Sequence, residues 1–278
     1  MPRFEGSLRK MGARLGAGSE AEVDYSMRVG DACVPLNPLL GKPVSLTFTG
    51  TIECIHCARV TKKSFSQGFC YPCFQKLAQC DRCIMSPELC HFDQGTCREP
   101  EWAETHCMTD HIVYLANSSG LKIGITRGTQ VPTRWIDQGA VSAVPLVRVA
   151  TRQQAGLLES AMKEHVADKT NWRTMLKNAQ PEIDMHAEFE RLAELAEPAI
   201  CELQEQFGLQ AIQLLDGSAV QHINYPVAQY PGKITSHNAE KTPEIAGVLQ
   251  GIRGQYWLLD TGVINLRKYT GYQVSFSF

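Results

Sequence analysis

The sequence predicts an α+β protein with a Cys-rich module, a central α/β segment and a small antiparallel β-domain at its C-terminus. Nine of the eleven cysteines fall between residues 54 and 107. Short apolar runs, a turn signal and helical patterns follow between residues 108 and 178. Four short strands separated by Gly-containing turns then close the chain. With 278 residues, of which 44% are apolar, the chain can form two or three small domains.

Residues 1–53 are predicted to form an N-terminal β segment. The first 40 residues are rich in glycine and poorly periodic, with short strands expected at 22–28 and 32–36. Residues 44–49 alternate apolar and hydroxyl side chains, a pattern that is typical of a half-buried strand. This strand could pair with the C-terminal sheet, which would make that domain discontinuous in sequence.

Residues 54–107 are predicted to form a metal-binding module. The segment has few aliphatic residues, so bound metal would have to replace a hydrophobic core. We find no export signal at the N-terminus, and a cysteine cluster in a cytoplasmic protein indicates metal ligands rather than disulfides. Two C-x2-C pairs, Cys54 with Cys57 and Cys70 with Cys73, have the spacing that completes a tetrahedral zinc site.

A second zinc ion is predicted from the remaining cysteines of the module, which makes two structural zinc ions in all. All-thiolate sites are closed, and closed sites are structural rather than catalytic. An iron–sulfur cluster is the rival occupant, but the terminal Cys-Pro signature of bacterial ferredoxins is missing. The preferred ligands are Cys80, Cys83, Cys90 and Cys97, with Cys107 or His91 as possible replacements for one of them.

Residues 108–178 are predicted to form the α/β core. Strands at 112–116 and 121–126 enclose a turn, a short helix follows at 132–138, and a third strand covers 141–150. A helix is expected over 152–169. Residues 179–210 form an acidic helical segment, with a helix over 182–207 that is broken at Pro198 and ended by Gly208. Residues 211–278 form the C-terminal β-domain, with strands at 247–252, 255–260, 262–268 and 271–278.

The net charge of −2 hides an uneven distribution. Residues 108–178 carry nine basic and five acidic side chains, whereas residues 179–210 carry one basic and eight acidic side chains. This segregation suggests a surface that faces a polyanion beside a separate solvated helix face, although chance segregation would give the same pattern. No stretch approaches 18 uncharged apolar residues, so neither a membrane-spanning helix nor a membrane partner is expected.

One ordered set of residues resembles the core of the GIY-YIG nuclease superfamily. The set begins with Val113-Tyr114-Leu115, a short turn and Lys122-Ile123-Gly124, and it continues with Arg134, Glu159 and Asn171. The closest sub-groups are those in which the second motif reads Lys-Ile-Gly. The twelve-residue spacing from Glu159 to Asn171 is similar to that of the excision-repair members.

The resemblance implies a role for each of these residues at a scissile phosphate. Tyr114 would be a base or a water-orienting group, and Arg134 would stabilise charge that develops on the phosphate. Glu159 would hold a single Mg²⁺ ion. Asn171 would fix the end of the helix that carries Glu159, and Gly124 would let backbone approach the substrate.

Lys122 stands where the superfamily has a second tyrosine, so it can contact phosphate but cannot relay a proton as a phenol does. The hairpin is also shorter than is usual in the superfamily. The whole chain, with its Cys-rich front and the stretches Gly124–Arg127 and 133–140, also resembles a bacterial family described as a domain of unknown function. That second resemblance implies no activity.

The function predicted from the sequence is a metal-dependent endonuclease-like protein that acts on DNA or RNA and contains structural zinc modules. The alternative is a non-catalytic, zinc-containing nucleic-acid-binding protein that keeps a degenerate GIY-YIG-like fold. A protein-interaction scaffold that docks partners on the acidic helix 182–207 is a third possibility.

Overall fold

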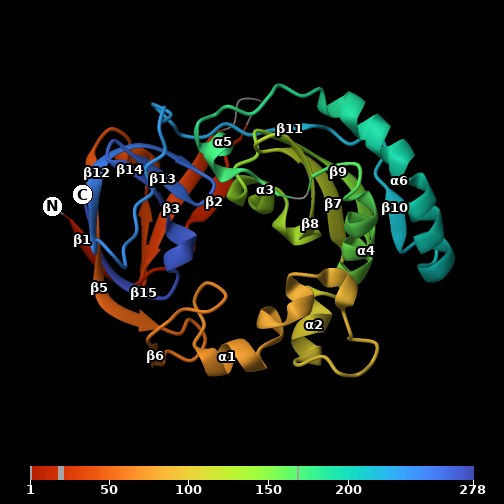
Figure 1. Cartoon of the computed structure of the whole chain (residues 1–278), viewed down its shortest axis with the longest axis horizontal. Coiled ribbons are helices and arrows are strands. Elements are labelled where there is room, and N and C mark those ends of the chain that lie inside the picture. Colours follow the sequence, from red (N-terminus) through yellow and green to blue (C-terminus); the bar gives the residue numbers. More distant parts are fainter. Residues whose placement is uncertain (1, 18–21, 168) are drawn as a thin grey trace.

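The computed structural model describes residues 2–17, 22–167 and 169–278, and it is an α+β structure with several antiparallel sheets. Figure 1 shows a β-domain that contains both chain termini, a central sheet that is flanked by helices, and the Cys-rich segment that runs between these two parts. The Cys-rich segment therefore touches both the β-domain and the central sheet.

The β-domain combines strands from both ends of the chain. Its larger sheet has the order β1-β15-β5-β12-β13-β14, with β6 paired to β5. The strand predicted at residues 44–49 lies within β5, between β15 and β12. A smaller sheet has the order β2-β3-β4. The bounds are β1 Arg3–Ser7, β2 Gly12–Leu15, β3 Val23–Val29, β4 Ala32–Pro35, β5 Pro43–Glu53, β6 Val60–Thr61, β12 Glu244–Arg253, β13 Tyr256–Leu259, β14 Gly262–Asn265 and β15 Tyr272–Ser277.

The central sheet contains the predicted hairpin. β7 (His111–Asn117) pairs with β8 (Leu121–Arg127) on one side and with β9 (Ser142–Val149) on the other. β10 (Ile212–Leu214) and β11 (Gln221–His222) also pair with β9. The sequence places these two segments in the C-terminal β-domain, but they extend the central sheet instead.

Both faces of the central sheet are buried. Val113 and Leu115 of β7 pack toward the helices α4 (Arg152–Met162) and α6 (Met185–Phe207). Tyr114 of the same strand points to the opposite face and joins the core of the β-domain. Trp135 of α3 (Thr133–Asp137) lies in that shared core as well. Burial on both faces explains why β7 has a continuous apolar run rather than alternation.

Two helices differ from the sequence prediction. The helix expected over 152–169 ends at Met162, because the chain turns there to run beside β8, where the backbone N–H of Ile123 donates to the carbonyl of Ala167 at 2.8 Å. The predicted break at Pro198 is wrong, since α6 continues through it. Pro198 is exposed, so water can satisfy the carbonyl that loses its helical partner. Gly208 ends the helix as predicted, with a φ of 92°.

The Cys-rich segment has little regular structure and no large apolar core. It contains α1 (Tyr71–Lys76), α2 (Pro100–His106) and short 3-10 turns. Among the described residues, none of the hydrophobic clusters includes a residue between 81 and 110. No helix in the described part of the chain is long and apolar enough to cross a membrane.

Candidate metal centre and basic cleft

Four cysteines converge at the start of the Cys-rich segment, as the two C-x2-C pairs predict. The sulfur atoms of Cys54, Cys57, Cys70 and Cys73 all lie within 4.8 Å of one another. The Sγ atoms of Cys57 and Cys70 are 3.7 Å apart. Tetrahedral zinc with bonds of about 2.3 Å places its sulfur ligands about 3.8 Å apart. The set can therefore hold a metal ion.

The local backbone positions these sulfur atoms and favours the ionised form of Cys54, whereas burial raises the pKa of Cys73. The first pair lies on a tight turn, in which the N–H of Ala58 donates to the carbonyl of Cys54 at 2.9 Å. The second pair begins α1, with Cys70 at the N-cap. Burial opposes ionisation of Cys54, but backbone hydrogen bonds from Cys70, Cys57 and His56 lower the pKa of its thiol to about 6. The thiolate is the form that binds metal.

The structure distributes the remaining cysteines differently from the preferred set. Cys80 packs in a hydrophobic cluster with Cys54, Cys70 and Cys73 of the first site. The other thiols of the segment surround a separate small cavity of about 20 Å³, and these are Cys83, Cys90, Cys97 and Cys107. Asp81, Cys83 and His91 also place ligand atoms within 4.8 Å of one another.

A basic cleft of about 220 Å³ lies where β8, α3 and α4 meet the Cys-rich segment. Lys122 of β8, Arg134 of α3 and Glu159 of α4 all line this cleft. Arg152 and Lys163 also line it, so four basic side chains face a single carboxylate among the described lining residues. Such a lining attracts an anion, and Glu159 is the one carboxylate in it that has the hard oxygen ligands a cation such as Mg²⁺ prefers.

Tyr114 lies beneath the cleft rather than in it. Its ring is fully buried, and its hydroxyl donates a hydrogen bond to Oε1 of Gln138 at 2.8 Å. Burial raises the pKa of Tyr114 to about 12, although Arg134 opposes this shift. Gln138 lines the cleft, so the phenol reaches it through this amide. A Cβ on Gly124 would come within 2.7 Å of the Tyr114 hydroxyl, so glycine makes room there for the phenol rather than for a substrate.

Asn171 does not fix the end of α4. Its side chain accepts hydrogen bonds from the backbone N–H groups of Arg173 and Thr174, so it is the N-cap of α5 (Trp172–Leu176). Its own N–H donates to Ser119 Oγ at 2.8 Å. The preceding residue, Thr170, accepts a hydrogen bond from Lys122 Nζ at 3.2 Å. Asn171 thus anchors the turn that contacts Lys122 and joins it to Ser119 in the hairpin loop.

A family model matches residues 41–274, which include the Cys-rich segment, the cleft and most of the β-domain. The chain belongs to the family described as a protein of unknown function, DUF2797. No curated protein and no solved structure matches the chain. The family description gives no activity, so function has to be inferred from the geometry of the site.

In this DUF2797 member, the Cys-rich segment forms one wall of the cleft. Ile84, Met85 and Pro87 line the cleft opposite the basic side chains. The carbonyl of Ile84 accepts a hydrogen bond from Arg152 Nη2 at 2.8 Å. Pro87 packs directly on α4, where a Cβ on Gly156 would come within 2.6 Å of the proline Cβ. The missing side chain of Gly156 therefore permits the close approach of wall and helix.

We expect the substitution Gly156→Val to separate this wall from α4. Valine cannot fit because its Cβ would also lie within 2.7 Å of the backbone nitrogen of Glu88, so the wall must shift. The expected loss is about 1–3 kcal/mol in the free energy of unfolding, measured by urea denaturation, together with faster proteolysis between residues 82 and 90. The control is Gly232→Val, which alters an exposed glycine that has open space around it and no positive φ. Unchanged proteolysis of the wall in the Gly156 variant would contradict this packing role.

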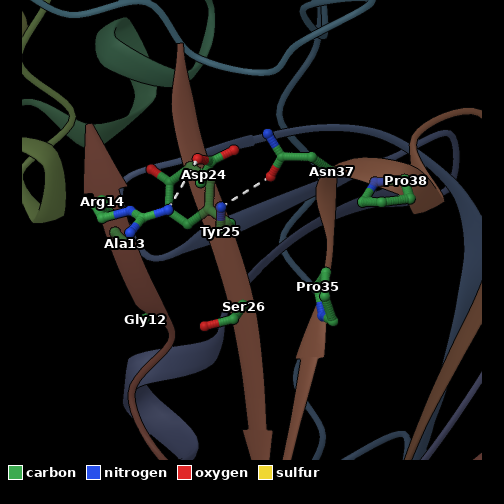
Figure 2. Close-up of a pocket in the computed structure, with 9 residues that line it drawn as sticks. All are labelled: Gly12, Ala13, Arg14, Asp24, Tyr25, Ser26, Pro35, Asn37 and Pro38. Carbon is green, nitrogen blue, oxygen red and sulfur yellow. Dashed lines mark hydrogen bonds and ion pairs between the residues drawn. The ribbon is translucent and has the colours of Figure 1, made fainter. Parts of the chain in front are cut away.

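A larger open pocket of about 600 Å³ lies on the small sheet of the β-domain. Figure 2 shows its lining on β2, on β3, and on the end of β4 with the residues that follow it. The charged side chains of its lining are Arg14 and Asp24, which form an ion pair at 3.9 Å. The amide of Asn37 is occupied by the backbone of Tyr25. The two charged side chains pair with each other and Asn37 pairs with backbone, so the basic cleft remains the better candidate for function.

Proposed function

We propose that the chain is an endonuclease-like protein that acts on DNA or RNA through a GIY-YIG-like core and depends on a divalent metal ion. The observation that carries the proposal is the convergence of Lys122, Arg134 and Glu159 on one cleft. These residues come from β8, α3 and α4, so the chain must fold before they meet. A set gathered from three elements is more specific than the sequence order alone.

The connectivity of the central sheet supports the same proposal. β7 lies between β8 and β9, with α3 between β8 and β9 in sequence and α4 directly after β9. The superfamily resemblance implies that the two motif strands pair centrally, and β7 and β8 pair along their whole length. Tyr114 and Gly124 are paired across the hairpin, which brings the two motifs together.

The chemistry of the lining suits a phosphodiester. Arg134 and Lys122 are placed to offset the negative charge of a phosphate, and charge stabilisation of this kind is usually the largest part of catalysis at such centres. Glu159 is half-buried and is the one carboxylate among the described lining residues. Mg²⁺ keeps most of its waters and needs only one or two carboxylates, so this donor set fits it. When bound, Mg²⁺ would polarise the phosphate and neutralise its developing charge.

For Tyr114 we propose a positioning role rather than proton abstraction. A phenol with a pKa raised to about 12 by burial remains protonated near neutral pH. Its hydroxyl fixes the Gln138 amide, and Gln138 faces the cleft where it can orient water or phosphate. The turn that Asn171 anchors would also have a positioning role, because Thr170 in this turn holds the ammonium group of Lys122 at the edge of the cleft.

For the first Cys set we propose a structural zinc ion. Four thiolates leave no open coordination position, and thiolates suit zinc better than hard cations. Reduced thiols of this kind suit a reducing compartment, so we place the protein in the cytoplasm.

A non-catalytic nucleic-acid-binding protein is the second candidate function. The hydroxyl of Tyr114 is directed to Gln138 and is buried, so no phenolate faces the cleft. Lysine in place of the second tyrosine keeps charge but no proton relay. A protein with these features would retain affinity for phosphate without turnover.

Cleavage assays distinguish the two candidates. Purified full-length chain is incubated with single-stranded, duplex and branched DNA and RNA in the presence of Mg²⁺ or Mn²⁺, with EDTA as the control. Metal-dependent cleavage of any of these substrates supports the endonuclease. Binding without cleavage of all of them would favour the second candidate, and no binding would exclude both.

We expect charge reversal in the cleft to lower the affinity for nucleic acid and to make that affinity less dependent on salt concentration. Arg134→Glu and Lys163→Glu each remove a basic lining residue. Each phosphate contact that is lost should lower the slope of log affinity against log salt by about one. Fluorescence anisotropy at several salt concentrations measures this slope. Arg191→Glu, on the exposed face of α6, is the matched control and should change little. Equal effects of all three reversals would place the binding surface elsewhere.

A further inference from the structure

We propose that a second zinc ion binds between Cys83, Cys90, Cys97 and Cys107. The four thiols come from separate parts of the Cys-rich segment, yet they line one small cavity. Their spacing in sequence leaves six, six and nine residues between neighbouring ligands. Four thiolates would form the closed tetrahedral set that holds structural zinc; the four sulfur atoms are not gathered within 4.8 Å of one another as those of the first set are, so the ion would draw them together. This inference does not depend on the proposed nuclease activity.

The size of the cavity suits one ion. Its volume of about 20 Å³ exceeds the roughly 10–15 Å³ that a single small occupant requires. An iron–sulfur cluster is the rival occupant for four thiolates, and elemental analysis for iron distinguishes it from zinc. Apolar side chains such as Phe92 and Trp102 complete the lining and would exclude water from the bound ion.

The fold of this part of the chain needs such an ion. Between residues 81 and 110, the described structure consists of short 3-10 turns, loops and the seven-residue helix α2. The described hydrophobic clusters include no residue of this stretch. A segment without its own core is typical of small metal-stabilised modules, in which binding of the ion supplies the folding free energy.

Cys107 replaces Cys80 in this set because of how the chain is folded. Cys80 follows α1 and packs with the first Cys set, away from the cavity. Cys107 is the C-cap residue of α2, and this helix brings its sulfur back to the cavity that Cys83 lines. Sequence spacing favours Cys80 because it pairs with Cys83, whereas the fold separates the two.

The group of Asp81, Cys83 and His91 is a weaker alternative for the same ion. Asp81 already forms an ion pair with Arg98 Nε at 2.7 Å, and this positive charge beside the carboxylate disfavours a cation. The Nδ1 atom of His91 lies 2.7 Å from Thr96 Oγ1, and its Nε2 atom faces Asp81 at 3.6 Å, so the ion pair of Asp81 with Arg98 is the main argument against this group. Both candidate ligand sets contain Cys83. Substitutions of Cys97 or Cys107 affect only the first set, and substitutions of Asp81 or His91 affect only the second, so these variants distinguish the two sets.

The second ion would fix the wall of the basic cleft. The carbonyl of Cys107 accepts a hydrogen bond from the backbone N–H of Arg152 at 2.8 Å. The carbonyl of Cys90 accepts one from Gln153 Nε2 at 3.1 Å. Two ligands of the ion are thus joined to the first turn of α4, the helix that carries Glu159. Loss of the ion should release the wall as well as the loops.

The test measures zinc in the full-length chain and its variants. Wild type should contain about two equivalents by elemental analysis. Cys97→Ser and Cys107→Ser should each fall to about one equivalent, because a site with three thiolates and a hydroxyl binds zinc much more weakly. The matched controls Cys80→Ser and His91→Ala should keep about two. In the Co²⁺-substituted wild type, the intensity of the thiolate charge-transfer absorption should correspond to two four-sulfur sites, and it should fall in Cys107→Ser but not in Cys80→Ser.

The same set of variants can overturn the proposal. Loss of one equivalent in Cys80→Ser with retention in Cys107→Ser would restore the set that spacing favours, and loss in His91→Ala would favour the Asp81 group. About one equivalent in the wild type, or stoichiometric iron with visible absorption, would exclude a second zinc ion. If Cys107→Ser is insoluble, Cys107→His supplies another zinc ligand, and it should retain both ions in a soluble protein. If Cys107→His contains only one equivalent of zinc while Cys80→Ser contains two, residue 107 is not a ligand position, and the proposal is overturned.

Discussion

Cys73→Ser is expected to release the ion of the first Cys set and to unfold the chain between residues 54 and 80. Cys73 is buried and lies in a small hydrophobic cluster, in which three of the six buried members are ligand cysteines and the others are Phe69, Leu77 and Cys80. Structural zinc contributes on the order of 10 kcal/mol to the folding of such modules, which is more than a cluster of this size can supply. The measurements are zinc content and limited proteolysis followed by mass spectrometry.

The rest of the molecule should survive this loss. The core of the β-domain includes no residue of the Cys-rich segment among its buried members. We therefore expect new cleavage sites confined to the Cys-rich segment, with the thermal transition of the β-domain retained. Cys33→Ser is the matched control, because Cys33 is exposed on β4 and belongs to neither group of thiols. A Cys73→Ser variant with full zinc content and unchanged proteolysis would show that Cys73 is not a ligand.

The sequence predicted well those elements that depend on a local pattern of neighbouring residues. The hairpin of β7 and β8 follows from two apolar runs around Asn117-Ser118-Ser119-Gly120. The end of α6 follows from Gly208, which adopts a positive φ. The first Cys set follows from its two C-x2-C pairs, because each pair is local and needs only a tight turn.

The elements that the sequence missed depend on tertiary contacts. β1 and β2 are short and contain Gly6 and Gly12, so no alternation reveals them, and β1 exists by pairing with β15 at the other end of the chain. The early end of α4 depends on the contact between the 163–167 turn and β8. Pro198 is tolerated within α6 because that face of the helix is solvated.

The candidate cleft shows the same limit. The resemblance to the GIY-YIG superfamily suggested Lys122, Arg134 and Glu159, which the fold brings to one cleft. The sequence did not indicate that Ile84 and Pro87 would form a wall of this cleft, because that wall comes from the Cys-rich segment. Nor did it indicate that the Tyr114 hydroxyl would be buried against Gln138, since burial depends on what packs on the strand.

Glu159→Gln is expected to abolish metal-dependent cleavage while nucleic-acid binding is retained. Glutamine has nearly the same shape as glutamate, and Glu159 is only half-buried, so the fold should tolerate the change. The substitution removes the one carboxylate among the described lining residues, and with it the hard anionic ligand for Mg²⁺. The expected fall in turnover is about 10²-fold or more, the size of effect that follows removal of one electrostatic group from a catalytic site.

Binding and cleavage should respond in opposite directions to this substitution. Removing a negative charge from a cleft with four basic lining residues lowers the repulsion of phosphate, so affinity measured without divalent metal should stay the same or rise. Glu164→Gln is the matched control, because Glu164 is exposed and lies just beyond α4. It should cleave as the wild type does. Equal cleavage by wild type and Glu159→Gln would show that Glu159 is not the metal ligand, and equal loss in both variants would indicate an effect of charge on the fold rather than on the site.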